Sequence, residues 1–376
     1  MEDPLPRLMS LIPVTATAGR NRLSPYLQFM AMVQDMRRVF RRPRPEIGGE
    51  RITEEWLKEQ DDTVLLWAFR LKEDEILALL EALHMPEPII VRGGSRFSAL
   101  EALCLTLARF RSSGDLYELS AKYGRAESAI SEVVNWTVSW VDERWGHLLN
   151  FDHEHLLSAN NLQRYADAIH AAGAPLRGCW GFIDCTIRRI CRPIKWQRQA
   201  YSGHKKYHAL KFQAVMLPNG MFGHLFGGEP GRHNDNHLLA KSRLLDQCLI
   251  HTTREHVDED LPYEEHYFQL FGDPAYGISP VLQSPFPGLH GRTEEETAWN
   301  NAMSKVRIEV EHGFGIVSRI FPFLDAGWKM QLFRSPVGTY YRTAVILVNG
   351  MNCLHPNQVS QRLNCPPPEI TEYFHD

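Results

Sequence analysis

The chain has 376 residues, 44% of them hydrophobic and 23% charged, the balance of an ordinary globular protein long enough for about two domains. No run approaches the roughly 20 apolar residues of a membrane span, and no signal peptide opens the chain, so we expect an intracellular protein outside membranes. The seven cysteines form no Cys-x-x-Cys pair, which argues against a disulfide framework and a zinc knuckle. A net charge of -4 argues against a uniformly basic coat for nucleic acid.

Residues 1–50 are predicted to form a basic, proline-rich arm, with the densest basic run between Arg37 and Pro45. A phosphate-binding arm and a nuclear-import signal are the two functional interpretations. The alternative, which we favour, is a flexible tail whose charges are simply solvated.

Residues 51–160 have the periodicity of a helical region. Helices are predicted at about 54–71, 72–83, 97–109, 116–123 and 126–140. The last two are joined by a turn at Gly124, and with the helix before them they follow the order of a helix-turn-helix module. Arg125 and Ser128 would then enter a major groove of DNA. The alternative is a helical bundle used for packing or oligomerisation.

The stretch from Cys179 to Arg188 has the composition of a buried strand around one carboxylate, Asp184. An ionised carboxylate at such a place persists only if hydrogen bonds, a basic partner or a metal ion offset its desolvation. This segment alone is compatible with either a structural or a functional Asp184.

A basic block follows the strand: from residue 188 to residue 211 there are eight Lys or Arg residues and no acid, interleaved with aromatic residues such as Trp196 and Tyr201. The eight are Arg188, Arg189, Arg192, Lys195, Arg198, Lys205, Lys206 and Lys211. Lys and Arg neutralise phosphates while aromatic rings stack on bases, so the block favours nucleic-acid binding. A solvated hairpin surface is the alternative.

Three further acids follow in the sequence. Two strands at about 207–217 and 221–226 are joined by a Pro-Asn-Gly turn, and a loop then leads to Asp235, which either caps a short helix at 237–245 or faces Asp184. Asp273 ends a predicted strand at 266–272, a usual place for an active site in α/β sheets. A long helix is predicted from 294 to about 320, with Glu311 beside its apolar stripe and Glu309 on the solvent side.

If Asp184, Asp273 and Glu311 converge, their oxygens would suit two magnesium ions. Such a pair allows one ion to activate the attacking oxygen while the other stabilises the leaving 3′-oxygen of a phosphodiester.

Five segments resemble the PIF/Harbinger family of DDE transposases and the nucleases derived from them, in the forms common in fungal genomes. They are Asp184-Cys-Thr, the run from Tyr201 to Gln213, Gly231-Arg-His-Asn-Asp235, Gly272-Asp-Pro-Ala-Tyr276 and Val310-Glu-His-Gly-Phe-Gly315. The resemblance extends from about Phe97 to the C-terminus.

The resemblance implies an α/β fold: an RNase H-like catalytic domain at 176–355, with a mixed sheet flanked by helices, between the N-terminal helix-turn-helix-like region and a C-terminal tail at 356–376. It implies that Asp184, Asp273 and Glu311 are catalytic and bind the metals, with Asp235 as a further metal ligand. The cofactors would be two Mg2+ ions, for which Mn2+ could substitute.

The implied substrate is double-stranded DNA, as transposon ends and as target. Hydrolysis at the ends would be followed by attack of the freed 3′-hydroxyl on target DNA. A Myb-like accessory DNA-binding protein, a homo-oligomer and a nuclear location are further implications.

Two positions depart from the family pattern. Asn234 stands where relatives often have a His directly before the Asp, and Cys185 replaces the Gly that many members have after the first Asp. Neither departure removes an acidic ligand. The alternative function is a domesticated, catalytically silent DNA-binding or scaffold protein that retains the transposase fold.

Overall fold

The computed structural model describes residues 48–254, 260, 262–288, 291–355 and 357–376, apart from the side chains of residues 264 and 309–314. The predicted basic arm therefore lies almost entirely outside the described residues. Two units are distinguished, Met1–Glu46 and Ile47–Asp376, and the second is described below. None of the helices in the described part has the length and apolar character needed to cross a membrane.

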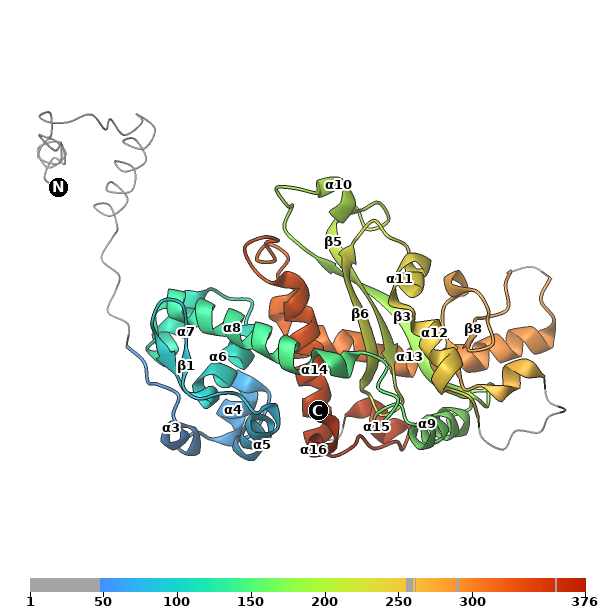
Figure 1. Ribbon diagram of the computed structural model, residues 1–376, viewed down its shortest axis with the longest axis horizontal. Coiled ribbons are helices and arrows are strands. Elements are labelled where there is room, and N and C mark those ends of the chain that lie inside the picture. The colour runs from blue at the N-terminus through green and yellow to red at the C-terminus, as the bar shows by residue number, and fades with distance from the viewer. Residues whose placement is uncertain (1–47, 255–259, 261, 289–290, 356) are drawn as a thin grey trace, which may run out of the picture. The chain divides into compact units, whose positions relative to one another are not determined.

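Helices make up the N-terminal part of this unit (Figure 1). They are α3 (Glu54–Lys58), α4 (Asp62–Phe69), α5 (Glu73–Leu83), α6 (Ala99–Arg111), α7 (Leu116–Tyr123) and α8 (Glu127–Trp145), with a small hairpin of β1 (Ile89–Ile90) and β2 (Arg96–Phe97). The helix predicted at 54–71 is divided in two because Asp61 accepts a hydrogen bond from the Thr63 amide and starts α4. Gly124 ends α7 in the left-handed conformation that glycine adopts easily, so the predicted turn is confirmed.

A mixed sheet forms the C-terminal part. Its strands are β3 (Cys179–Arg189), β4 (Tyr201–Ser202), β5 (Tyr207–Met216), β6 (Phe222–Pro230), β7 (Gln269–Phe271) and β8 (Leu282–Gln283). The central strand β3 pairs antiparallel with β5 and parallel with β7; β6 pairs antiparallel with β5, and β8 lies parallel to β7. This mixed α/β arrangement with flanking helices is compatible with the expected RNase H-like fold.

The turn between β5 and β6 confirms the Pro-Asn-Gly prediction. Gly220 has a φ of 80°, and the Asn219 side chain accepts a hydrogen bond from the Met221 amide at 3.0 Å. Asn352 and Asn357 donate hydrogen bonds to the carbonyl oxygens of Gly220 and Asn219 at 2.9 and 2.8 Å. The C-terminal residues therefore hold the hairpin in place.

Three longer helices pack around the sheet: α9 (Ala159–Ala171), α13 (Glu294–Ile320) and α14 (Val337–Leu354). The buried Asn349 of α14 accepts a hydrogen bond from the Phe222 amide and donates one to its carbonyl, at 2.9 and 3.0 Å. Thr343 of the same helix bonds the Val138 carbonyl of α8 at 3.0 Å. Helix α14 thus joins the N-terminal helices to the sheet, as Figure 1 shows.

The remaining elements are short. They include α10 (Gln197–Ala200), α11 (Asp235–Ser242), α12 (Leu244–His251), η2 (Tyr263–His266), η3 (Pro274–Tyr276), η4 (Pro322–Asp325), α15 (Gln358–Arg362) and α16 (Ile370–Tyr373). The helix predicted at 237–245 is interrupted because Arg243 adopts a left-handed conformation with φ of 55°. The strand predicted at 266–272 is shorter: residue 266 belongs to the turn η2, and β7 covers Gln269–Phe271 only.

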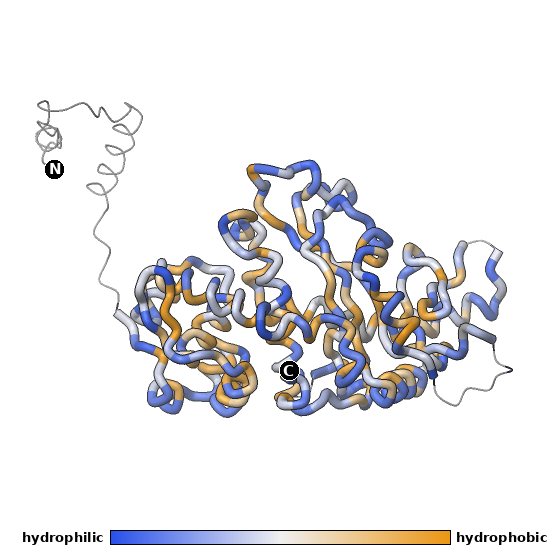
Figure 2. The backbone as a smooth tube through the Cα atoms, in the orientation of Figure 1, coloured by the Kyte–Doolittle hydropathy of each residue, from blue (hydrophilic) through white to orange (hydrophobic). Residues whose placement is uncertain are grey.

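Hydrophobic residues dominate the strands in Figure 2, whereas the segment around α10 is mostly hydrophilic.

Candidate functional site

Asp184 lies where strand β3 leaves the core. The strand is buried from Cys179 to Ile183 and partly exposed from Asp184 onward, and the Asp184 side chain is 33% exposed. One of its carboxylate oxygens accepts the Cys185 amide hydrogen at 2.7 Å, and the other lies 3.8 Å from a guanidinium nitrogen of Arg307 in α13. Partial hydration and this basic neighbour offset the cost of placing a charge on a central strand.

Asp273 follows the strand next to β3. Strands β3 and β7 run parallel, and the last pair in their register is Phe182 with Phe271. Asp184 and Asp273 each lie two residues beyond that pair, so both carboxylates leave neighbouring strands at the same level. The Asp273 side chain also caps η3 by accepting the Ala275 amide hydrogen at 2.7 Å.

Asp235 is the first residue of α11, and Asn234, not Asp235, is the residue that caps this helix. The Asn234 side chain accepts the His237 amide hydrogen at 2.9 Å. The Asp235 carboxylate forms an ion pair with the Lys211 ammonium of β5. A hydrogen bond of 2.7 Å from Asn236 to the Ala275 carbonyl holds the start of α11 against the segment that follows Asp273.

A cavity of about 550 Å3 opens between these elements. Asp235, Asp273 and Lys211 line it together with Cys185, Ile187, Ser202, Gly203, His204, Lys205, Gly231, Arg232, His233 and Asn234. Beside it, the Tyr276 hydroxyl donates a hydrogen bond to the Cys185 sulfur at 3.3 Å. Burial raises the pKa of Tyr276, and the nearby Cys185, Asp235 and Asp184 act in the same direction, so these acids share one electrostatic neighbourhood.

The predicted third ligand, Glu311, lies outside the described side chains. Its position in α13 follows Arg307 by four residues, about one turn of an α-helix. Arg307 contacts Asp184 and was not among the residues singled out from the sequence. The four-residue spacing from Glu311 was the signal that could have found it.

Within the basic block, the Arg188 side chain bonds other parts of the protein. Its guanidinium bonds Ser318, the Asp325 carboxylate at 3.1 Å and the Tyr341 hydroxyl at 3.1 Å, and lies 4.7 Å from the Tyr341 ring centroid. The side chain is 14% exposed. The prediction of a DNA contact at Arg188 is therefore corrected: this residue ties β3 to α13, η4 and α14.

The rest of the block is on the surface, except Lys211 in the cavity. Arg189, Arg192, Lys195, Arg198, Lys205 and Lys206 are all exposed. Trp196 and Ile194 in the same segment are 65% and 82% exposed. This surface, which begins at the rim of the cavity with Lys205, combines cations with exposed apolar side chains.

In the helical region, Arg125 is likewise turned inward. Its guanidinium bonds the Glu101 carboxylate, at 2.6 Å from the Arg125 Nε, and the Arg96 carbonyl at 2.9 Å, and it lies 4.2 Å from the Phe97 ring centroid. The Arg125 and Glu101 side chains are 13% and 5% exposed. The predicted base contact at Arg125 is thus a buried ion pair, whereas Ser128 is exposed.

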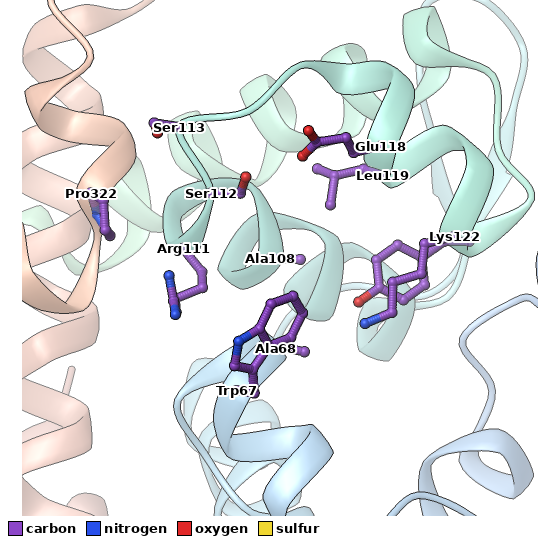
Figure 3. A pocket seen from close by; sticks show the side chains of 11 residues that line it. Trp67, Ala68, Ala108, Arg111, Ser112, Ser113, Glu118, Leu119, Lys122 and Pro322 are labelled. Carbon is purple, nitrogen blue, oxygen red and sulfur yellow. The ribbon is translucent and has the colours of Figure 1, made fainter.

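A second cavity, of about 320 Å3, lies among α4, α6, α7 and Pro322 (Figure 3). The Trp67 ring forms part of its wall, with the Lys122 ammonium 5.2 Å and the Arg111 guanidinium 5.8 Å from the ring centroid. Glu118 is the one carboxylate among its lining residues. Its donor set therefore does not suit a divalent ion, unlike the cavity beside Asp273.

Comparison with known proteins gives two matches and one negative result. Residues 183–349 match the family model described as DDE superfamily endonuclease, a span that contains all four predicted acidic ligands. The chain is similar to Protein ALP1-like of Arabidopsis thaliana, with 24% identity over 199 residues, which are 52% of this chain and 47% of that protein. The chain thus spans about half the length of this curated relative. No solved structure matches the chain.

Proposed function

We propose, from the premise that residues 183–349 form a DDE superfamily endonuclease domain, that this chain cleaves phosphodiester bonds of double-stranded DNA and joins the freed 3′-hydroxyl to target DNA. The observation that carries the proposal is the level placement of Asp184 and Asp273 on neighbouring parallel strands. The Asp235 side chain, from a third element, enters the cavity that Asp273 lines.

The donor set fits divalent metal ions, on which DDE endonucleases depend. Carboxylate oxygens are the hard ligands that Mg2+ prefers, and Mn2+ accepts the same donors. Asp184 and Asp235 are each paired with a cationic side chain, Arg307 and Lys211, which a bound metal ion would have to displace or share. Asp184, Asp273 and Glu311 would hold two Mg2+ ions, with Asp235 beside them. Bound there, the ions would activate the attacking oxygen and stabilise the leaving 3′-oxygen.

The chain's own residues complete the arrangement. Lys211 is held at the cavity wall by Asp235 and by a hydrogen bond of 3.2 Å to the His233 carbonyl, so its ammonium faces the space where a phosphate would enter. The hydrogen bond from Asn236 to the Ala275 carbonyl joins the residue after Asp235 to the segment that follows Asp273. Such positioning reduces the reorganisation that the reaction would otherwise require.

Cleavage of duplex DNA by the purified full chain tests the proposal. With Mg2+ or Mn2+ we expect nicked or cut product from DNA that contains transposon ends, and with the metal removed by EDTA we expect none. The same assay is repeated with a Myb-like protein added, as the proposed accessory DNA-binding partner. DNA binding without cleavage under every metal condition would support the alternative of a catalytically silent DNA-binding protein.

The exposed basic surface beside the cavity should contact DNA phosphates. Lys205→Gln/Lys206→Gln removes up to two phosphate contacts, so the slope of log affinity against log salt should become shallower by about one to two units. Binding to one duplex across a salt series measures this slope.

The matched control is Arg51→Ala/Lys58→Ala, which removes the same charge from exposed positions at and before α3. Its slope should equal that of the wild type. An unchanged slope in the Lys205/Lys206 variant would place the DNA path elsewhere.

The homo-oligomer, the Myb-like partner and the nuclear location are proposed on the family resemblance alone. Gel filtration of the full chain tests the first, and imaging of the tagged chain in cells tests the last.

A further inference from the structure

A group of metal-ligand side chains lies next to, but outside, the set of four acids. Glu229 is near the end of β6, His233 is in the following loop and His237 is in the first turn of α11. In the sequence, each follows the previous one by four residues. One ligand atom of each lies within 4.8 Å of the other two. The His233 Nδ1 is 3.6 Å from a Glu229 oxygen, and the two imidazole rings are 3.9 Å apart between centroids.

Hydrogen bonds do not pair every polar atom of this group. The His233 Nδ1 is buried and finds no hydrogen-bond partner among the described residues. Its distance of 3.6 Å from the Glu229 carboxylate is too long for a hydrogen bond. Buried nitrogens are normally paired, so an unpaired imidazole nitrogen beside a second imidazole and a carboxylate indicates a missing partner. A cation that accepts nitrogen and oxygen ligands would supply it.

We propose that Glu229, His233 and His237 bind a transition-metal ion of the Zn2+ class. Two imidazoles and one carboxylate with a fourth position open to solvent are a common zinc ligand set. Zn–N and Zn–O bonds of about 2.0–2.1 Å in a tetrahedron put the ligand atoms about 3.4 Å apart, so atoms within 4.8 Å of one another need to close by at most about 1.4 Å. Imidazole ligands select Zn2+, Co2+ or Ni2+ over Mg2+, which separates this site chemically from the carboxylates of the proposed catalytic centre.

The ion would act on the segment that carries Asp235. Residues 229–237 connect β6 to α11, and Asp235 lies between the two histidines in the sequence. Metal bonds at both ends of this segment would restrict its motion and hold the Asp235 carboxylate at the cavity. This role rests on the proposed function, whereas metal binding itself does not.

The Lys241 ammonium would compete with a metal ion for the Glu229 carboxylate, which gives a test of the site. Its ammonium lies 2.7 Å from a Glu229 oxygen, and the side chain is 53% exposed. Metal binding must displace or tolerate this cation. Lys241→Met should therefore raise metal affinity, by about threefold to tenfold if the ammonium opposes the ion through a solvated gap.

Titration of the full chain with Co2+ tests the proposal, with the visible absorption of tetrahedral Co2+ as the readout and Zn2+ as the competing ion. The wild type should bind one equivalent at this site. His237→Ala and Glu229→Gln should each weaken binding by at least about tenfold. His204→Ala, which removes another exposed histidine at the same cavity, is the matched control and should bind as the wild type does.

Two further variants make the outcome decisive. The gain from Lys241→Met should vanish in a Glu229→Gln background, because the ammonium then has no carboxylate to block. Asp184→Asn should bind Co2+ as the wild type does, so a protein that cleaves no DNA can still confirm this site. Equal Co2+ binding by wild type, His237→Ala and Glu229→Gln would overturn the proposal, as would loss of binding in Asp184→Asn alone.

Discussion

Asp184→Asn is expected to lower DNA cleavage by about 1000-fold or more while leaving the fold and DNA binding nearly unchanged. The substitution keeps the side-chain shape and the oxygen that accepts the Cys185 amide hydrogen, but removes the negative charge. Loss of a charged metal ligand costs several kcal/mol of transition-state stabilisation, and each 1.4 kcal/mol is about a factor of ten in rate. Single-turnover cleavage of an end-labelled duplex with Mg2+ measures the effect.

Asp273→Asn and Glu311→Gln should give losses of the same order, because they remove ligands of the same ions. Asp246→Asn is the matched control: this acid is exposed on α12, pairs with Arg243 at 3.2 Å and lies away from the proposed ligands in the sequence. Glu309→Gln, on the predicted solvent side of α13, should also leave cleavage unchanged. A folded Asp184→Asn protein with normal cleavage would exclude this mechanism.

Arg125→Ala should destabilise the protein by about 3–5 kcal/mol, the usual cost of removing one partner of a buried ion pair. It leaves the Glu101 carboxylate, which is 5% exposed, without its guanidinium, and it also removes the hydrogen bond to Arg96 and the contact with the Phe97 ring. Thermal or urea unfolding measures the loss. Ser128→Ala, at an exposed position three residues later, should change stability by less than about 0.5 kcal/mol.

A double-mutant cycle separates the ion pair from a DNA contact. Arg125→Ala combined with Glu101→Gln should cost less than the sum of the two single changes, because the two side chains interact. The same proteins can be assayed on specific and on random DNA. Unchanged stability of Arg125→Ala together with a selective loss of binding to specific DNA would instead restore the prediction that Arg125 contacts bases.

Sequence alone was sufficient where the determinant is local. The apolar periodicity predicts the helix 294–320 with the bounds that the structure has, and Pro218-Asn-Gly220 defines the hairpin turn. The buried composition around Asp184 predicted the central strand. Helix caps, turns and strand patterns depend on neighbouring residues, so a single sequence contains the information.

Only the tertiary structure decided which charged side chains form ion pairs with one another. Arg125 and Glu101 are 24 residues apart, and Arg188 and Asp325 are 137 residues apart, so no periodicity relates them. Both arginines have the sequence context of DNA contacts, yet packing of distant segments buries them against acids. A buried guanidinium requires a carboxylate within reach, and only the arrangement of helices and strands supplies one. The level placement of Asp184 and Asp273 likewise depends on the parallel register of β3 and β7, which is set by packing across the sheet.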